Sequence, residues 1–383
     1  MPEEVARSCD RPMEIGGDNS CRATPFNAAE LLQDFSKLVR ANTDIRADTR
    51  TESGSCQSLT DSPTQPREGD IKLDDATRSS VIQTLVQNLK ANYVFPDVAD
   101  QISNSLLSRS FGDISSGIDF AKALTDQLRS SGMDKHLDVS FNPTQSDSTS
   151  EQENLDESLK AQRLENSGVA RAELFGNTGI LKLDSFWPTS DPNNPEGARM
   201  AREAIDAAMA KLAGADNLII DLRENTGGDP ATVAHALSHL LPADTHINSI
   251  IWRNPSPQHP DAVENPRLGG FEQQFKTHDV GNSLQNVKNI YVLTSCNTFS
   301  GGEEMAYDLQ ALGRATIIGD VTGGGANPGE GVKLSPNFSA FIPTGRAYNP
   351  ITQTNWEGVG VKPDVQVTSD QALIRALELI HRK

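Results

Sequence analysis

The sequence of 383 residues predicts an α/β core preceded by a small N-terminal domain of three helices and a disordered tail. Strand-like apolar runs alternate with amphipathic helical segments from about residue 179 onward, which is the pattern of βαβ units. Three further helical segments precede these runs, and roughly the first 70 residues contain little periodic apolar pattern. A chain of this length accommodates about two or three domains.

The tail spans residues 1–70, where Ser, Thr, Asp, Glu, Arg and Pro predominate. Only the stretch A28-A-E-L-L-Q-D-F-S-K-L-V has a helical pattern, with Leu31, Phe35 and Leu38 on one face. The remainder, such as T49-R-T-E-S-G-S-C-Q-S, cannot bury enough apolar surface to offset the entropy of ordering. We therefore expect the tail to be mostly disordered.

The helical domain is predicted over residues 71–135. Its first helix is indicated by V81-I-Q-T-L-V-Q-N-L-K, where Val81, Leu85 and Leu89 repeat every four residues. The pair F95-P ends this helix, because proline disfavours helical geometry in the residue before it. Residues 98–107 and 118–128 provide two more amphipathic segments, which together predict a small helical bundle.

The core is predicted over residues 136–383, with a polar, low-complexity loop at 143–167. Strands are expected at 179–186, 217–223, 289–294 and 315–319, and helices at 198–212, 230–241 and 302–312. The run N217-L-I-I-D-L-R is typical of a strand that is buried on both faces. In such sheets, ligands and catalytic groups lie at the carboxyl ends of the strands.

Composition narrows the function classes. The net charge of −18 disfavours a nucleic-acid surface, which requires clustered Lys and Arg, and also disfavours docking on anionic membranes. No apolar run approaches the roughly 18–20 residues of a bilayer span, and the acidic N-terminus does not resemble a signal peptide. We therefore expect a cytoplasmic protein without nucleic-acid or membrane partners. The four cysteines match no zinc-module spacing, and no basic neighbour of Cys296 suggests an activated thiol.

Ser300 lies in T294-S-C-N-T-F-S-G-G-E-E, between an apolar strand and a helix. Its spacing from Glu303 fits a capping box, in which the hydroxyl only satisfies amides at a helix start. The same position suits a nucleophile, because the glycines that follow leave their amides open to a developing oxyanion. Gly227 and Gly228 offer similar amides after another strand. Spacing alone favours the interpretation of these glycines as tight turns.

A catalytic serine needs a base, and seven histidines are candidates. His235 and His239 are four apart on a predicted helix, a spacing compatible with metal binding, but no H-E-x-x-H pattern surrounds them and packing is favoured. His136 lies where the helical domain meets the core and can face a cleft, although position alone favours a solvated loop histidine. The others lie in polar loops or at the terminus: His246, His259, His278 and His381. Asp221 and Arg223 end a buried strand, where we expect a structural ion pair.

Four motifs occur in order along the chain: D221-L-R-E-N-T-G-G, T294-S-C-N-T-F-S-G-G-E-E-M-A-Y-D-L-Q, G313-R-A-T-I-I-G-D-V-T-G-G and G358-V-G-V-K-P-D-V. They resemble the superfamily of the C-terminal processing peptidases, the tricorn core protease and interphotoreceptor retinoid-binding protein. K90-A-N-Y-V-F-P and D134-K-H-L-D-V-S-F-N-P resemble the retinoid-binding-protein branch and its bacterial relatives. The resemblance covers about residues 71–380.

This resemblance implies a ClpP/crotonase-like core with a helical N-terminal domain. It identifies Ser300 as the nucleophile and the amide of Gly301 as one oxyanion donor. The other donor is expected from the T-G-G turn, at Gly227 or Gly228.

The resemblance also indicates the base. The processing peptidases use a lysine in a T-x-G-K turn, where T322-G-G-G-A here has Gly325, so a serine–lysine dyad is absent. The tricorn-like branch pairs its serine with a histidine and a glutamate, whose positions match His136 and Glu357. That branch has a further serine before its histidine, where this chain has Lys135.

These residues predict a serine peptidase that cleaves a peptide or protein substrate through an acyl-enzyme. No metal or nucleotide cofactor is implied, the stretch between Phe141 and Gly179 is too short for a PDZ module, and the sequence leaves open whether a homo-oligomer forms. The main alternative is a non-catalytic module that holds a retinoid or another lipid on the same fold, which has no need of a complete triad. Crotonase-type acyl-CoA chemistry is a third reading, and it does not require Ser300.

Overall fold

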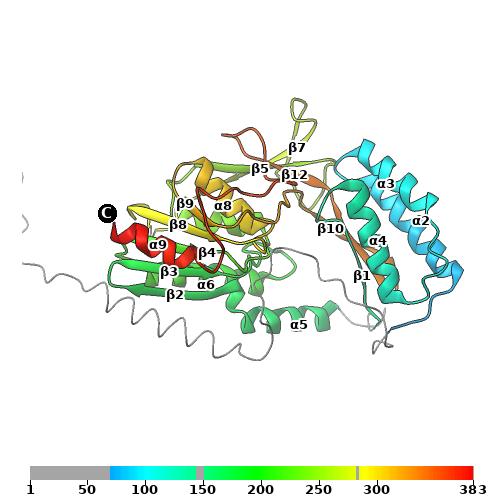
Figure 1. The fold of residues 1–383 in the computed structure, drawn as a ribbon, viewed down its shortest axis with the longest axis horizontal. Helices are drawn as coiled ribbons and strands as arrows, with labels where there is room; N and C mark the ends of the chain where they lie inside the picture. Colours follow the sequence, from blue (N-terminus) through cyan, green and yellow to red (C-terminus); the bar gives the residue numbers. More distant parts are fainter. Residues whose placement is uncertain (1–69, 144–150, 282–283, 383) are drawn as a thin grey trace, which may run out of the picture. The chain divides into compact units, whose positions relative to one another are not determined.

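The computed structural model describes residues 70–143, 151–281 and 284–382 of the chain (Figure 1). The tail that is predicted to be disordered, with its candidate helix at 28–39, lies outside these residues apart from Asp70. Within the described ranges, no helix combines the length and the apolar character that crossing a membrane would require.

Three helices form the N-terminal module, as predicted: α2 (Asp75–Asn92), α3 (Pro96–Ser108) and α4 (Gly117–Gly132). Their starts follow from local sequence. The Asp74 side chain accepts a hydrogen bond from Thr77 N at 2.7 Å, and the Ser116 side chain caps α4 in the same way. Pro96 occupies the first turn of α3, where the amide that proline lacks is not needed, so it favours the start of this helix. Helix α2 has already ended at Asn92.

These helices cover an antiparallel sheet in the order β1–β11–β10 (Figure 1). Its strands are β1 (Asp138–Phe141), β10 (Gly329–Ser335) and β11 (Phe338–Pro343). The Phe120 ring meets the Phe338 ring edge-on, with centroids 5.7 Å apart, and Ile342 is fully buried in the same hydrophobic core. The helices therefore share their core with a hairpin from near the other end of the chain, and His136 lies at this junction, just before β1.

A six-stranded sheet forms the main core, in the order β13–β9–β8–β4–β3–β2, and all neighbouring strands are parallel except β2 and β3. Its strands are β2 (Val169–Phe175), β3 (Thr178–Leu183), β4 (Asn217–Asp221), β8 (Asn289–Thr294), β9 (Thr316–Gly319) and β13 (Val365–Gln366). The helices among and after them are α6 (Pro195–Lys211), α7 (Pro230–Ser238), α8 (Gly301–Ala311) and α9 (Ala372–His381). This alternation confirms the predicted α/β core.

The register of β4 against β8 brings two distant turns together. Both strands are almost wholly buried and run parallel, with Asp221 opposite Leu293. Their carboxyl ends therefore meet at one edge of the sheet. The T-G-G turn follows β4 and the segment that carries Ser300 follows β8, so this edge is where a site is expected.

A second antiparallel sheet, which the sequence pattern did not predict, has the order β12–β5–β7–β6. Its strands are β5 (His246–Trp252), β6 (Val263–Asn265), β7 (Gly270–Lys276) and β12 (Gly345–Tyr348). Side chains of β7 are half-buried or exposed in an irregular pattern, so its residues lack the alternation that marks a strand.

The prediction of a polar loop over residues 143–167 is wrong for its second half, where residues 151–164 form α5 (Glu151–Leu164). Leu159 and Gln162, about one turn apart, are buried. The Gln162 amide donates to Gly197 O at 2.8 Å and to Ser167 Oγ at 3.0 Å. A narrow buried stripe is enough to dock an otherwise polar helix, and its low apolar content hid the helical period.

Candidate active site

Ser300 is the N-cap of α8, with φ 52° and ψ −121°, a conformation that residues other than glycine rarely adopt. Its amide donates to Glu303 Oε2 at 3.0 Å, which is the glutamate half of the predicted capping box. A strained serine at a strand-to-helix turn is also the arrangement that exposes a nucleophilic hydroxyl. The helix start and a reactive hydroxyl are therefore compatible at this position.

The turn after β4 lies directly against Ser300. A Cβ atom on Gly227 would lie 2.7 Å from Ser300 Cβ, and one on Gly301 would lie 3.2 Å from the Gly228 nitrogen. The Gly227 amide is already used, because it donates to Asn225 Oδ1 at 2.8 Å. Within the described part of the chain, the amides of Gly228 and Gly301 have no acceptor. Two adjacent open donors therefore lie beside the serine.

Glu303 is fully buried and connects the Ser300 turn to the turn at residues 322–325. Besides the Ser300 amide, its carboxylate accepts hydrogen bonds from Thr322 Oγ1 at 2.5 Å, Gly324 N at 2.6 Å and Gly325 N at 2.8 Å. Burial raises the pKa of Glu303 above its ordinary value, although these donors oppose the shift. One carboxylate thus fixes both turns relative to each other.

The turn at 322–325 leaves room for an imidazole where the processing peptidases have a lysine. A Cβ atom on Gly325 would lie 2.3 Å from Phe299 Cζ and 2.8 Å from His136 Cε1. The His136 ring packs against the Phe299 ring, with centroids 4.6 Å apart, so it contacts the residue just before Ser300. Any side chain at position 325 would compete with His136 for this space.

Two carboxylates accompany His136. One ring nitrogen of His136 and one oxygen each of Asp134 and Glu357 lie within 4.8 Å of one another. Asp134 is fully engaged, because its oxygens accept hydrogen bonds from Tyr93 OH, Asn327 Nδ2 and His136 N. Asp134 Oδ1 lies 3.9 Å from His136 Nδ1, which is beyond hydrogen-bond distance. Glu357 Oε2 accepts a backbone hydrogen bond at 2.5 Å, whereas Glu357 Oε1 and His136 Nδ1 are buried without a hydrogen-bond partner among the described residues. A single proton could satisfy both of these atoms.

The buried setting shifts both pKa values toward neutral forms. Burial lowers the pKa of His136 to about 4, and the charge of Arg129 adds to this shift. Burial raises the pKa of Glu357 to about 8, and the charge of Asp134 contributes. His136 is therefore uncharged at neutral pH, which is the form that can accept a proton.

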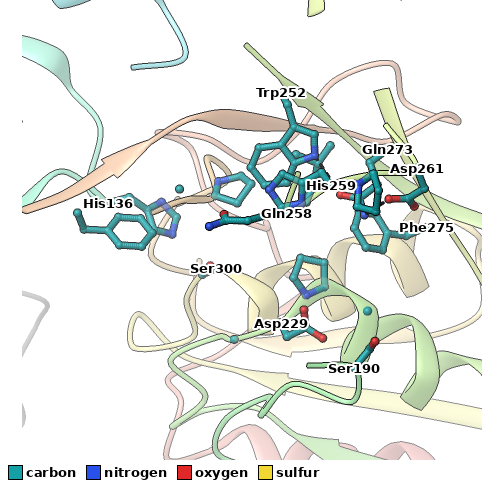
Figure 2. A pocket seen from close by; sticks show the side chains of 18 residues that line it. His136, Ser190, Asp229, Trp252, Gln258, His259, Asp261, Gln273, Phe275 and Ser300 are labelled. Atoms are coloured by element: carbon teal, nitrogen blue, oxygen red, sulfur yellow. Dashed lines mark hydrogen bonds between the residues drawn. The ribbon is translucent and has the colours of Figure 1, made fainter. Parts of the chain in front are cut away.

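Ser300 and His136 line one cavity of about 720 Å³. Figure 2 shows them at one end of this cavity and Asp261, Gln273 and Phe275 at the other. No hydrogen bond joins the Ser300 hydroxyl to His136, or His136 to Glu357, in this arrangement of the described residues. Such contacts are often long without a bound substrate and shorten when one binds.

Among the other candidate bases, His259 also lines this cavity, where it stacks on Trp252 with ring centroids 3.6 Å apart. Four further residues that the sequence singled out do not line it: Asp221, Arg223, His235 and His239. Asp221 and Arg223 form the expected ion pair, with Nε–Oδ1 and Nη2–Oδ2 distances of 2.8 and 2.7 Å, and Arg223 also donates to Ser369 O. His235 and His239 lie at the C-terminal end of α7, where they contact Asp206.

Sequence reasoning missed two residues that shape the site. Asn225 holds the Gly227 amide and also donates to Leu183 O, and Asp134 accepts the His136 amide. Each lies two positions before the residue whose amide it accepts, and this spacing is the only feature of the local sequence that indicates its role. Their distant partners become visible only in the folded chain.

Comparisons with known proteins show the family of the chain. Residues 177–367 match the model of peptidase family S41, and residues 71–173 match the N-terminal domain of peptidase S41 in eukaryotic IRBP. The nisin-resistance protein of Lactococcus lactis subsp. lactis is 25% identical over 199 residues, which are 52% of this chain and 59% of that protein. The match therefore spans less than two thirds of that relative.

Two solved structures are similar to the chain. Mature CPAF has a TM-score of 0.53 at 13% identity and covers 81% of this chain and 97% of its own. The tricorn protease has a TM-score of 0.44 at 13% identity, over 80% of this chain and 37% of its own. The likeness to CPAF concerns the fold, which is the predicted ClpP/crotonase-like core. Since two consecutive domains of one family account for residues 71–173 and 177–367, the chain belongs to peptidase family S41, a family of serine peptidases.

Proposed function

We propose that the chain hydrolyses peptide bonds through an acyl-enzyme, with Ser300 as nucleophile, His136 as general base and Glu357 as the carboxylate that orients the imidazole. The observation that carries this proposal is the strained Ser300, which lies beside the two open amides of Gly228 and Gly301 and shares a cavity with His136. An amide such as that of Gly301 is open at any helix start, but a helix cap alone needs neither the strain at Ser300 nor a second open amide from another turn.

Proton transfer begins the reaction. His136 Nε2 takes the hydroxyl proton as Ser300 Oγ bonds to the carbonyl carbon of the scissile bond. The imidazolium that forms carries a proton on Nδ1, and this proton can bond to the bare Glu357 Oε1. Both atoms that are buried without partners in the free protein are then satisfied, so the charged state is stabilised when it is needed.

The two open amides would hold the oxyanion. The carbonyl oxygen becomes negative in the tetrahedral intermediate, and hydrogen bonds from Gly228 N and Gly301 N stabilise it there. Each such donor contributes about 3–4 kcal/mol to catalysis. Because the Gly227 amide is used by Asn225, Gly228 is the donor that the T-G-G turn supplies.

The remaining steps reuse the same groups. The imidazolium gives its proton to the leaving amine, the C–N bond breaks, and the acyl group stays on Ser300. His136 then takes a proton from water as the water attacks the ester, and returns it to Ser300 Oγ as the ester C–O bond breaks and the acid product leaves. Trp252, Phe275 and Phe341 provide apolar surface along the cavity for side chains of an extended peptide.

A module that only binds a hydrophobic ligand is the second candidate. The apolar part of the cavity wall favours it, because it would suit a lipid as well as a peptide. Such a module would not depend on Ser300, so the same experiment separates the two functions.

Hydrolysis of unfolded casein by the full-length chain tests the proposal. Ser300→Ala is expected to abolish cleavage while circular dichroism stays unchanged, and Ser190→Ala, which removes another hydroxyl from the cavity wall, is expected to retain it. Cleavage by Ser300→Ala at the wild-type rate would move the nucleophile elsewhere. Absence of cleavage by the folded wild type would favour the binding module.

A further inference from the structure

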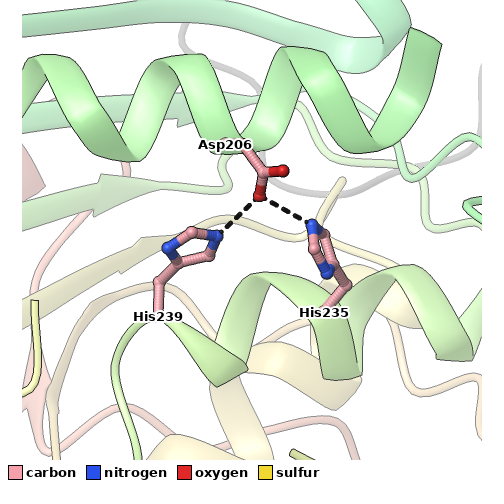
Figure 3. A group of neighbouring side chains, drawn as sticks. All are labelled: Asp206, His235 and His239. Atoms are coloured by element: carbon pink, nitrogen blue, oxygen red, sulfur yellow. Dashed lines mark hydrogen bonds and ion pairs between the residues drawn. The ribbon is translucent and has the colours of Figure 1, made fainter. Parts of the chain in front are cut away.

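A second histidine–carboxylate cluster lies outside the cavity. It consists of Asp206 on α6, His235 on α7 and His239 at the end of α7, as Figure 3 shows. His235 Nε2 and His239 Nε2 each lie 2.9 Å from the same oxygen, Asp206 Oδ1. The two imidazoles are 7% and 1% exposed, whereas the Asp206 side chain is 51% exposed. The three donors therefore converge on a point that solvent can reach.

The geometry is close to that of a metal centre. One donor atom from each residue lies within 4.8 Å of the others. Zinc bound tetrahedrally at about 2.0–2.1 Å separates neighbouring ligand atoms by about 3.3 Å. The separation of 2.9 Å between each nitrogen and the oxygen requires only a small expansion to admit an ion. Two residues four apart on one helix, with a third from a neighbouring helix, form a stable frame for this.

Hydrogen bonds around His235 fix the orientation of its ring. Ser238 Oγ donates to Ala234 O at 2.7 Å and accepts from His278 N at 3.0 Å, and it lies 3.3 Å from His278 Nδ1. His235 Nδ1 lies 3.1 Å from His278 Nε2. The ring of His235 is therefore held from its far side, with Nε2 turned toward the Asp206 carboxylate.

His235 Nε2 and His239 Nε2 both lie 2.9 Å from Asp206 Oδ1, so three donor atoms on two helices point at one place. The hydrogen bond from His235 Nδ1 to His278 is also the kind of contact that orients a metal-bound imidazole.

We propose that Asp206, His235 and His239 bind one divalent transition-metal ion of the zinc class, with water completing the coordination on the exposed side of Asp206. Two imidazoles and a carboxylate are ligands that zinc accepts readily. The ion ties α6 to α7. Helix α7 begins at the residue after Asp229, which lines the active-site cavity. The primary effect of the ion is therefore to stabilise the fold beside the active site, and the ion takes no part in the reaction.

Calorimetric titration with zinc chloride tests the site on full-length protein that has been stripped with EDTA. The wild type is expected to bind one zinc ion more than Asp206→Asn or His235→Gln, or to bind that ion at least about tenfold more tightly. His381→Gln, which removes an exposed histidine at the end of α9, should match the wild type. X-ray absorption should show nitrogen ligands at about 2.0–2.1 Å.

Equal zinc stoichiometry and affinity in the wild type and Asp206→Asn would overturn the proposal, as would the absence of zinc binding by the wild type. The cluster would then be a hydrogen-bonded network without an ion. If His235→Gln does not fold, Asp206→Asn decides alone, because the half-exposed Asp206 is not part of the core. Zinc held by cysteines elsewhere in the chain would be present equally in all variants, so it does not affect the comparison.

Discussion

Two clusters in this protein combine histidine with carboxylates, and they differ in which atoms are already engaged. Around His136, the oxygens of Asp134 accept three hydrogen bonds from the protein, while His136 Nδ1 and Glu357 Oε1 have no hydrogen-bond partner among the described residues. In the second cluster, His235 Nδ1 is paired with His278 Nε2, and the Nε2 atoms of His235 and His239 both lie against Asp206 Oδ1. A cluster with a bare nitrogen and a bare oxygen is suited to moving a proton, and one with converging donors is suited to holding an ion.

The largest expected effect comes from the first cluster. His136→Gln removes the base, so kcat/KM for peptide hydrolysis should fall by about 10²–10⁴-fold, while zinc binding should stay at the wild-type level. The reverse pattern is expected for Asp206→Asn. If His136→Gln instead keeps activity within about tenfold of the wild type, the base is another group and the contrast between the clusters disappears.

Glu357→Gln should change the pH profile. Glu357 has a pKa of about 8, so the carboxylate that accepts the His136 Nδ1 proton is present only above that pH, whereas His136 is neutral above about 4. Wild-type kcat/KM should therefore rise with pH and level off above about 8. Glutamine does not titrate, so kcat/KM of the variant should be lower and should not rise with pH near 8. A rise near pH 8 that persists in the variant would show that another group causes it.

The same shift has a cost in stability. Folded Glu357 binds its proton more tightly than the unfolded residue, whose pKa is near 4.5. The contribution of this residue to the free energy of unfolding is therefore full below about 4.5, declines as pH rises to about 8, and then stays constant. Chemical denaturation of the wild type and Glu357→Gln at pH 5 and pH 9 would measure it, and an equal pH dependence in both would contradict the assignment.

A smaller effect is expected at Gly325. Gly325→Ala places a methyl group against Phe299 and His136, so we expect the free energy of unfolding to fall by about 1–3 kcal/mol and activity to fall as the imidazole is displaced. Gly214→Ala is not a suitable control, because its φ of 88° is itself unfavourable to alanine. Gly331→Ala is better matched, since nothing lies near its added Cβ. Equal stability of the two variants would show that position 325 has room to spare.

The smallest effect on activity should come from removing metal. Chelation should leave kcat/KM within about twofold of the zinc-loaded value, because no residue of the second cluster lines the cavity. It should lower the melting temperature, since a ligand at 100 times its Kd stabilises the native state by about 2.7 kcal/mol. An activity that depends strictly on added zinc would contradict the separation of the two clusters.

Local patterns predicted a large part of this fold. The buried run of β4, the helical periods of α2 and α4, and the strand–helix alternation of the core are all properties of short segments, so they are visible in sequence. The sheet β12–β5–β7–β6 and helix α5 are not, because their side chains are largely polar or unevenly buried. Helices α2–α4 pack on a sheet that contains the hairpin of residues 329–343. This packing depends on pairing between β1 and the distant β11, which local sequence patterns do not reveal.

The candidate site divides in the same way. Ser300 and the glycine turns could be found from spacing, while His136 and Glu357 came only from the resemblance to a family. Which glycine amide remains open depends on the Asn225 side chain, and the role of Glu303 in joining two turns depends on contacts about 20 residues apart in sequence. For His235 and His239, the four-residue spacing was visible, but Asp206 lies on another helix.

The central claim is that Ser300 is made reactive by His136. Its most direct test is the rate at which a fluorophosphonate probe labels the full-length protein, with the modified residue identified by mass spectrometry. The account predicts an adduct on Ser300 in the wild type, none in Ser300→Ala, and labelling slowed by about 10²–10⁴-fold in His136→Gln. A folded wild type that takes up no probe, or a His136→Gln variant labelled as fast as the wild type, would contradict it.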